Sequence, residues 1–144
     1  MRLLILGGTR FLGRHLVEAA LARGAQPTLL NRGRTAPGLF PAVEQLRGDR
    51  EGDLQVLRGR TWDAVIDTCG YLPRVVRRSA QALRDAVGRY LFVSSISVYA
   101  DAAASRQDEH APRAQLPGDD CEDIPNHYGA LKAACEDEVQ RLFG

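Results

Sequence analysis

The stretch at residues 2–13, RLLILGGTRFLG, decides the fold of this chain of 144 residues. Residues 3–6 form a continuous apolar run, which is typical of a strand buried on both faces of a parallel sheet. Two glycines follow, and the next apolar side chains recur at helical spacing. A buried strand that turns through glycines into a helix is typical of an α/β domain that binds a phosphate group at the turn.

The rest of the chain continues this alternation. Short apolar runs predict four more strands, at residues 26–30, 43–47, 62–67 and 90–94. Amphipathic spacing predicts helices after the glycine turn, from near Pro73 to a cap at Gly88, and over residues 126–143. We expect one α/β domain over residues 1–144, a doubly wound Rossmann-like parallel sheet of about five strands in the order 3-2-1-4-5.

Composition excludes several classes of protein. Hydrophobic residues make up 44% of the chain and charged residues 26%, which are globular proportions and do not fit a disordered, coiled-coil or fibrous protein. The apolar run at residues 3–6 is too short for a membrane span or a signal peptide, so we expect a cytoplasmic protein without a membrane partner. The three cysteines have no paired spacing, and we expect neither disulfides nor a metal site.

Charge is distributed unevenly along the sequence. Residues 1–89 carry a net charge of +7 and residues 90–144 a net charge of −6, although the whole chain is only +1. The basic front part favours an anionic ligand, and this pattern fits a nucleotide as well as a nucleic acid.

The glycine turn has the features of a dinucleotide site. Gly7 permits the tight turn, and Gly13 lets the helix approach the strand closely. Arg10 stands where a third glycine is usual, and Asn31 and Arg32 follow the second strand where a carboxylate would bind a ribose 2′-hydroxyl. Because guanidinium groups bind phosphate oxygens, these arginines favour NADP over NAD. The alternatives are a turn that binds nothing and arginines that are merely solvated.

A tyrosine and a lysine form a candidate acid–base pair. Lys132 is the only lysine of the chain and follows Tyr128 by four residues. Positions four apart share one helix face, and a neighbouring cation lowers the pKa of a phenol from its ordinary value of about 10 toward the range useful for proton transfer. The alternative is a surface tyrosine and lysine on an amphipathic helix.

Five motifs in their order along the chain resemble those of the short-chain dehydrogenase/reductases, specifically the extended or atypical NAD-dependent epimerase/dehydratase family. They are GGTRFLG at residues 7–13, GD at 48–49, TCG at 68–70, FVSSISVY at 92–99 and YGALK at 128–132. The resemblance covers essentially the whole chain and implies an oxidoreductase or isomerase that moves hydride between a nicotinamide and a carbinol or carbonyl carbon. It implies a small carbonyl or nucleotide-sugar-like substrate.

The resemblance also implies roles for individual residues. Tyr128 would be the general acid and base, Lys132 would bind the nicotinamide ribose and lower the tyrosine pKa, and Ser95 would bind the substrate oxygen. Asp49 would contact the adenine. The other residues implied or predicted to bind NADP or NAD are Gly7, Thr9, Arg10, Phe11, Leu12, Gly13, Asn31, Arg32, Thr68, Cys69 and Gly70.

The chain departs from the family pattern at its end. The family's sheet continues beyond the tyrosine helix into a substrate-binding region, whereas this chain stops at Gly144. We therefore expect either a piece of a longer enzyme or a short remnant, lacking the substrate-binding part. Either form would expose an apolar edge beside the fifth strand, where a second copy would bind to form a homo-oligomer.

Two other functions remain open from the sequence. GGTRFLG together with NRG at residues 31–33 also resembles the chloroplast stem-loop-binding branch of the family, whose members are associated with RNA. An RNA-binding or regulatory protein that keeps the dinucleotide fold is therefore one alternative. A catalytically inert fragment is the other.

Overall fold

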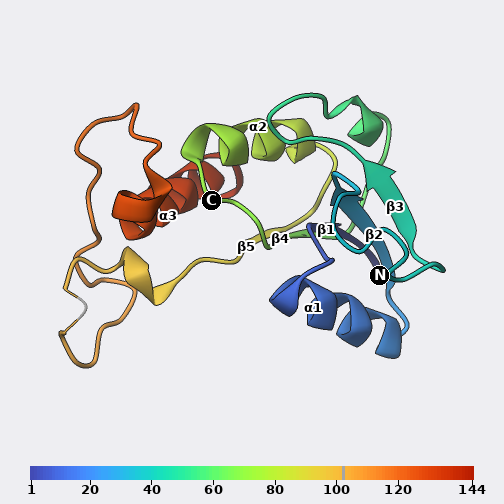
Figure 1. The fold of residues 1–144 in the computed structure, drawn as a ribbon, viewed down its shortest axis with the longest axis horizontal. Coiled ribbons are helices and arrows are strands. Elements are labelled where there is room, and N and C mark those ends of the chain that lie inside the picture. The colour runs from blue at the N-terminus through green and yellow to red at the C-terminus, as the bar shows by residue number, and fades with distance from the viewer. Residues whose placement is uncertain (102) are drawn as a thin grey trace.

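Figure 1 shows the computed structural model of the chain, which describes residues 1–101 and 103–144. Five parallel strands form one sheet in the order β3-β2-β1-β4-β5, as the sequence predicts. The strands are β1 (Arg2–Leu6), β2 (Gln26–Asn31), β3 (Glu44–Arg47), β4 (Ala64–Asp67) and β5 (Tyr90–Phe92). Each has a parallel partner in register, for example Leu4 opposite Thr28 on one side and Val65 on the other.

Helices cover the two faces of the sheet. Helix α1 (Phe11–Ala22) lies on one face, and α2 (Pro73–Leu83) and α3 (Ile124–Phe143) lie together on the other (Figure 1). Two short 3-10 helices, η1 (Gln55–Leu57) and η2 (Ile96–Val98), follow β3 and β5. In the described part of the chain, no helix has both the length and the apolar character needed to cross a bilayer.

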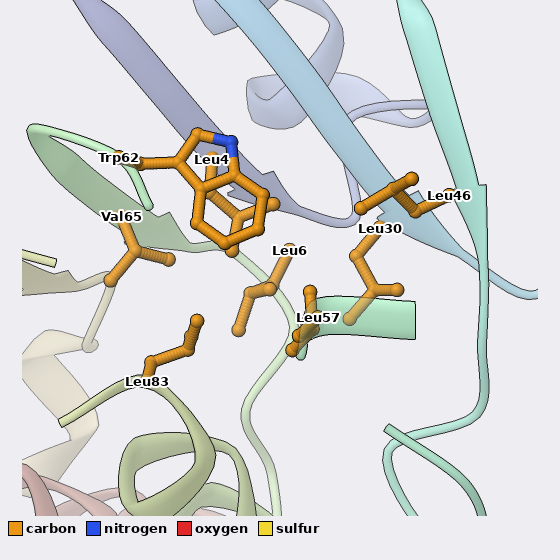
Figure 2. Close-up of a cluster of buried hydrophobic side chains, with 8 residues drawn as sticks. All are labelled: Leu4, Leu6, Leu30, Leu46, Leu57, Trp62, Val65 and Leu83. Atoms are coloured by element: carbon orange, nitrogen blue, oxygen red, sulfur yellow. The ribbon is translucent and has the colours of Figure 1, made fainter. Parts of the chain in front are cut away.

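Strand β1 divides the core into two clusters because successive side chains point to opposite faces. Leu3 and Ile5 pack toward α1 with Val17. The cluster on the α2 side includes the single tryptophan and comprises Leu4, Leu6, Leu30, Leu46, Leu57, Trp62, Val65 and Leu83 (Figure 2). Burial on both faces explains why the strand is apolar from Leu3 to Leu6, after the exposed Arg2.

The end of α2 differs from the prediction. The apolar spacing predicts a helix that reaches Val87, but α2 ends at Leu83 and Val87 instead forms a parallel bridge with Trp62. The backbone N–H of Trp62 donates to Ala86 O at 2.8 Å, so the approach to β4 takes its hydrogen bonds from the residues that follow α2. Strand pairing outweighs helix propensity here.

Strand β5 is also shorter than predicted, because Ser95 already caps η2. Leu91 of β5 is 49% exposed, which places an apolar side chain on the last strand of the described sheet. Whether a second copy covers this strand stays a prediction.

Candidate functional site

The turn after β1 is shaped by close packing of its glycines. Gly7 and Gly8 have φ values of +104° and +89°, a region that side chains other than glycine rarely adopt. A Cβ atom on Gly13 would lie 2.9 Å from the backbone nitrogen of Gly8, so only glycine lets α1 begin this close to the turn. Arg10 occupies the N-cap position without a side-chain hydrogen bond to the helix. The start of α1 therefore offers backbone N–H groups and a positive dipole end to an anion.

The backbone of the same turn is strained at Phe11. Its φ of +34° is unusual for a residue with a side chain, and the residue is 87% exposed. Such strain persists where the surrounding structure imposes it and is frequent at ligand sites.

A cavity of about 550 Å³ runs along the carboxyl edge of the sheet beside this turn. It is lined by the segments that follow four neighbouring strands, from β1 to β4. The residues predicted to bind cofactor that line it are Gly7, Thr9, Arg10, Phe11, Leu12, Gly13, Asn31, Arg32, Asp49, Thr68 and Cys69. The fold thus brings together residues more than 60 positions apart in the sequence.

Gly70 is the one predicted cofactor residue that does not line the cavity. A Cβ atom there would meet Phe92 at 2.5 Å and Val76 at 2.6 Å, so the residue is packed between β5 and α2. Its carbonyl oxygen accepts a hydrogen bond from Lys132 Nζ at 2.9 Å. The structure therefore gives Gly70 a packing role next to the lysine.

The loop after β2 holds its arginines at the cavity rim. The Asn31 side-chain oxygen accepts a hydrogen bond from the Gly33 N–H at 2.8 Å and fixes this turn. Arg32 and Arg34 line the cavity and are exposed. The Arg47 guanidinium lies over Gly33, where a Cβ atom would be 1.1 Å from Nη1. This end of the cavity is consequently rich in positive charge.

Lys132 is almost fully buried, with 3% of the residue exposed. Its Nζ donates to Gly70 O at 2.9 Å and to Val93 O at 2.6 Å, and it lies 3.9 Å from the centroid of the Phe92 ring. Burial lowers the pKa of the Lys132 ammonium below its ordinary value. The lysine therefore ties together the segments that follow β4 and β5.

Tyr128 and Lys132 lie against the same side chain, Tyr71. The rings of Tyr128 and Tyr71 are 6.5 Å apart, and Lys132 Nζ is 5.8 Å from the Tyr71 ring centroid. Tyr128 is 36% exposed, and Tyr71 itself lines the cavity. The predicted acid–base pair thus adjoins the cavity through Tyr71, a residue that the sequence analysis does not single out.

Ser95 is positioned by η2 and by the close approach of α3. Its Oγ accepts a hydrogen bond from the Ser97 N–H at 3.1 Å and also lies 3.1 Å from Ser97 Oγ. A Cβ atom on Gly129 would be only 1.9 Å from the Ser97 carbonyl oxygen. Since Gly129 adjoins Tyr128 in the sequence, this contact brings the serine loop to the tyrosine helix.

A buried ionic network supports the cavity, and the sequence analysis misses it. Arg50 Nη1 and Nη2 bind the two oxygens of Asp67 at 2.7 and 2.6 Å, and Arg50 Nε donates to Ser79 Oγ at 2.8 Å. The Tyr90 hydroxyl donates to Asp67 Oδ2 at 2.8 Å. The network fastens the segment after β3 to the end of β4. The sequence feature that could have predicted this network is Asp67 at the end of the apolar run WDAVID, because a buried carboxylate needs a positively charged partner.

Burial and this network also set the ionisation of nearby groups. Burial disfavours the charged form of Arg50, but its interactions with Asp67, Cys69 and Tyr90, that with Asp67 first among them, together outweigh burial and raise the arginine pKa. Burial, followed by the Asp67 charge, raises the pKa of both Cys69 and Tyr90. Cys69 and Tyr90 therefore stay protonated at neutral pH.

Together, the sheet order and the glycine turn define an α/β domain with a Rossmann-like fold. Solved structures share this fold with the chain. A UDP-galactose 4-epimerase is 23% identical, with a TM-score of 0.78, over 100% of this chain and 53% of that one. The Bordetella bronchiseptica enzyme WbmG in complex with NAD is 20% identical, with a TM-score of 0.79, over 99% of this chain and 50% of that one.

A third similar structure is MoeE5 in complex with UDP-glucose and NAD, which is 22% identical, with a TM-score of 0.73, over 99% of this chain and 49% of that one. The chain therefore spans about half the length of these structures. No protein-family model and no curated protein matches the sequence.

Proposed function

We propose that this chain is the dinucleotide-binding part of an NAD(P)-dependent oxidoreductase or epimerase of the short-chain dehydrogenase/reductase type. The observation that supports this proposal most is the cavity at the carboxyl edge of the sheet. The glycine turn lines this cavity, and so does Tyr71, which contacts the Tyr128–Lys132 pair. Similar structures that contain NAD support the cofactor class.

The residues around the cavity fit such a cofactor. The glycine turn and the start of α1 would hold the pyrophosphate, because they line the cavity and the unpaired backbone N–H groups at the start of a helix bind anions. Asp49 would contact the adenine, and Thr68 and Cys69 would border the riboses. When bound, the nicotinamide supplies the hydride chemistry.

The chain's own side chains would handle the proton and the substrate oxygen. Tyr128 would exchange a proton with that oxygen, and Ser95 would bind it. Lys132 would place its positive charge beside the phenol. Two of its three N–H groups donate to carbonyl oxygens, and the third would bind the nicotinamide ribose. The substrate class we propose is a small carbonyl or nucleotide-sugar-like compound, and MoeE5, with UDP-glucose bound, is a similar structure.

We propose NADP as the preferred cofactor. Arg10, Arg32 and Arg34 line the cavity, and guanidinium groups bind phosphate with charge-assisted hydrogen bonds. Fluorescence titration should therefore show tighter binding of NADPH than of NADH, and Arg32→Glu should reverse the order. Exposed Arg23→Glu on the far end of α1 is the control and should leave the ratio unchanged. Equal affinities of the unaltered protein for the two cofactors would contradict the preference.

The RNA-binding alternative has less support from the surface of α2. Arg74 and Arg77 are paired with Glu122 and Glu138, so these two cations are already partly neutralised. RNA binding that falls steeply with salt would nevertheless favour this alternative. We keep the dinucleotide as the proposed ligand.

A further inference from the structure

Tyr71 connects the cofactor cavity with the proposed acid–base pair. It lies in the segment between β4 and α2, is 46% exposed and lines the cavity. Tyr128 and Lys132 do not themselves line the cavity. Tyr71 is therefore the cavity-lining residue that contacts both members of the pair.

The surroundings of Tyr71 hold it in place before any ligand binds. The carbonyl of the preceding Gly70 accepts a hydrogen bond from Lys132 Nζ, and the following Leu72 is the N-cap of α2. The Tyr71 ring is inclined by 41° to the Tyr128 ring, at a centroid distance of 6.5 Å, which is within the range of aromatic pairs. The backbone on both sides of Tyr71 is thus anchored, and its ring lies against the Tyr128 ring.

The position along the cavity indicates which part of a dinucleotide Tyr71 would meet. Arg32 and Arg34 lie at the end of the cavity after β2, and the glycine turn lies after β1. Tyr71 follows β4, on the other side of the turn from these arginines, since the sheet order is β2-β1-β4. If the pyrophosphate lies at the turn and the adenosine at the arginines, the second nucleoside reaches Tyr71.

We propose that Tyr71 binds the nicotinamide nucleoside of the cofactor, packing its ring against this nucleoside beside Lys132. This inference rests on the proposed function and adds a binding residue to it. Burial raises the pKa of Tyr71, so its hydroxyl remains a hydrogen-bond donor at neutral pH.

The test compares two ligands that share the adenosine end. NADP⁺ has the nicotinamide nucleoside, whereas adenosine 2′,5′-bisphosphate lacks it. By calorimetry, Tyr71→Ala should weaken NADP⁺ binding roughly five- to tenfold and bisphosphate binding by less than about twofold, as expected for the loss of one aromatic contact. Tyr71→Phe keeps the ring and should retain most of the NADP⁺ affinity.

Leu21→Ala, on the exposed surface of α1, is the matched control and should change neither affinity. Equal weakening of both ligands by Tyr71→Ala, or no weakening of either, would overturn the role of Tyr71. If the unaltered protein binds neither ligand, the proposed function itself fails. Should Tyr71→Ala not fold, Tyr71→Leu gives the same comparison, because leucine fills space without an aromatic face.

Discussion

Asp67 is a carboxylate with no exposed surface, and the protein can bury it only because Arg50, Tyr90 and the Cys69 backbone supply hydrogen bonds. A buried charge that loses its partner is far more costly than an exposed one. Asp67 shapes the cavity by holding Arg50, which lines it.

Removal of the Asp67 charge should therefore destabilise the fold. Asp67→Asn leaves the Arg50 guanidinium buried without its counter-ion, and we expect the free energy of unfolding to fall by about 3–5 kcal/mol. Urea denaturation followed by the fluorescence of Trp62, the only tryptophan, measures this.

The control is Glu18→Gln, which breaks the exposed pair with Arg14. Exposed pairs contribute about 0–1 kcal/mol, so this variant should unfold at nearly the original urea concentration. Similar losses in the two variants would show that the Asp67 network is not the buried support described here.

Cys69 provides a pH-dependent probe of the cavity. Burial raises its thiol pKa, and only the thiolate reacts with an alkylating agent, so its thiolate fraction at neutral pH is lower in the folded chain than in the unfolded chain. In a Cys121→Ser background, we expect slow iodoacetamide labelling that accelerates as the pH rises through the alkaline range. Cys135 is fully buried, and burial raises its pKa to about 12, so it should stay unlabelled.

Mass spectrometry of the labelled peptides checks this prediction, with the urea-unfolded chain as the reference. Because Cys69 lines the cavity, NADPH should slow its labelling further. Labelling of the folded chain at the rate of the unfolded chain would contradict the burial of this thiol.

At the scale of elements, α3 and η2 form one unit through Gly129. The Ser97 carbonyl occupies the space that a side chain on Gly129 would need. This contact relates the loop that carries Ser95 to the helix that carries Tyr128 and Lys132, so the proposed catalytic groups depend on it.

Gly129→Ala should separate these two elements. The added methyl group would overlap the Ser97 carbonyl, and overpacking of this kind costs about 1–3 kcal/mol of unfolding free energy. Thermal unfolding measures the loss. Gly38→Ala is the control, because a Cβ atom there meets nothing within 4 Å, and it should unfold at the original temperature. Equal stability of both variants would contradict the tight contact.

Most elements could be predicted from the sequence, and the failures have physical causes. Local apolar patterns and glycines locate the strands, and the right-handedness of parallel crossovers then gives their order. The end of α2 could not be predicted, because Val87 has the right spacing for a helix but pairs with Trp62, which is distant in the sequence. Element boundaries depend on such tertiary contacts.

At the scale of the whole molecule, the candidate site is formed by segments along one edge of the sheet and not by a single sequence motif. All but one of the residues predicted from the sequence to bind cofactor line the cavity, because they follow predicted strands. Arg50 and Tyr71 could not be predicted as site residues, because their roles depend on contacts with residues far away in the sequence. Spacing within one helix relates Tyr128 to Lys132, but only the folded structure brings Tyr71 between them and the cavity.

Hydrogen–deuterium exchange with and without NADPH tests this arrangement most directly. A dinucleotide at the carboxyl edge should slow amide exchange in residues 7–13, 31–35 and 68–72, while residues 78–83, the last turns of α2, should exchange as before. Unchanged exchange in the first three segments at saturating NADPH, or protection confined to α2, would contradict a dinucleotide site in this cavity.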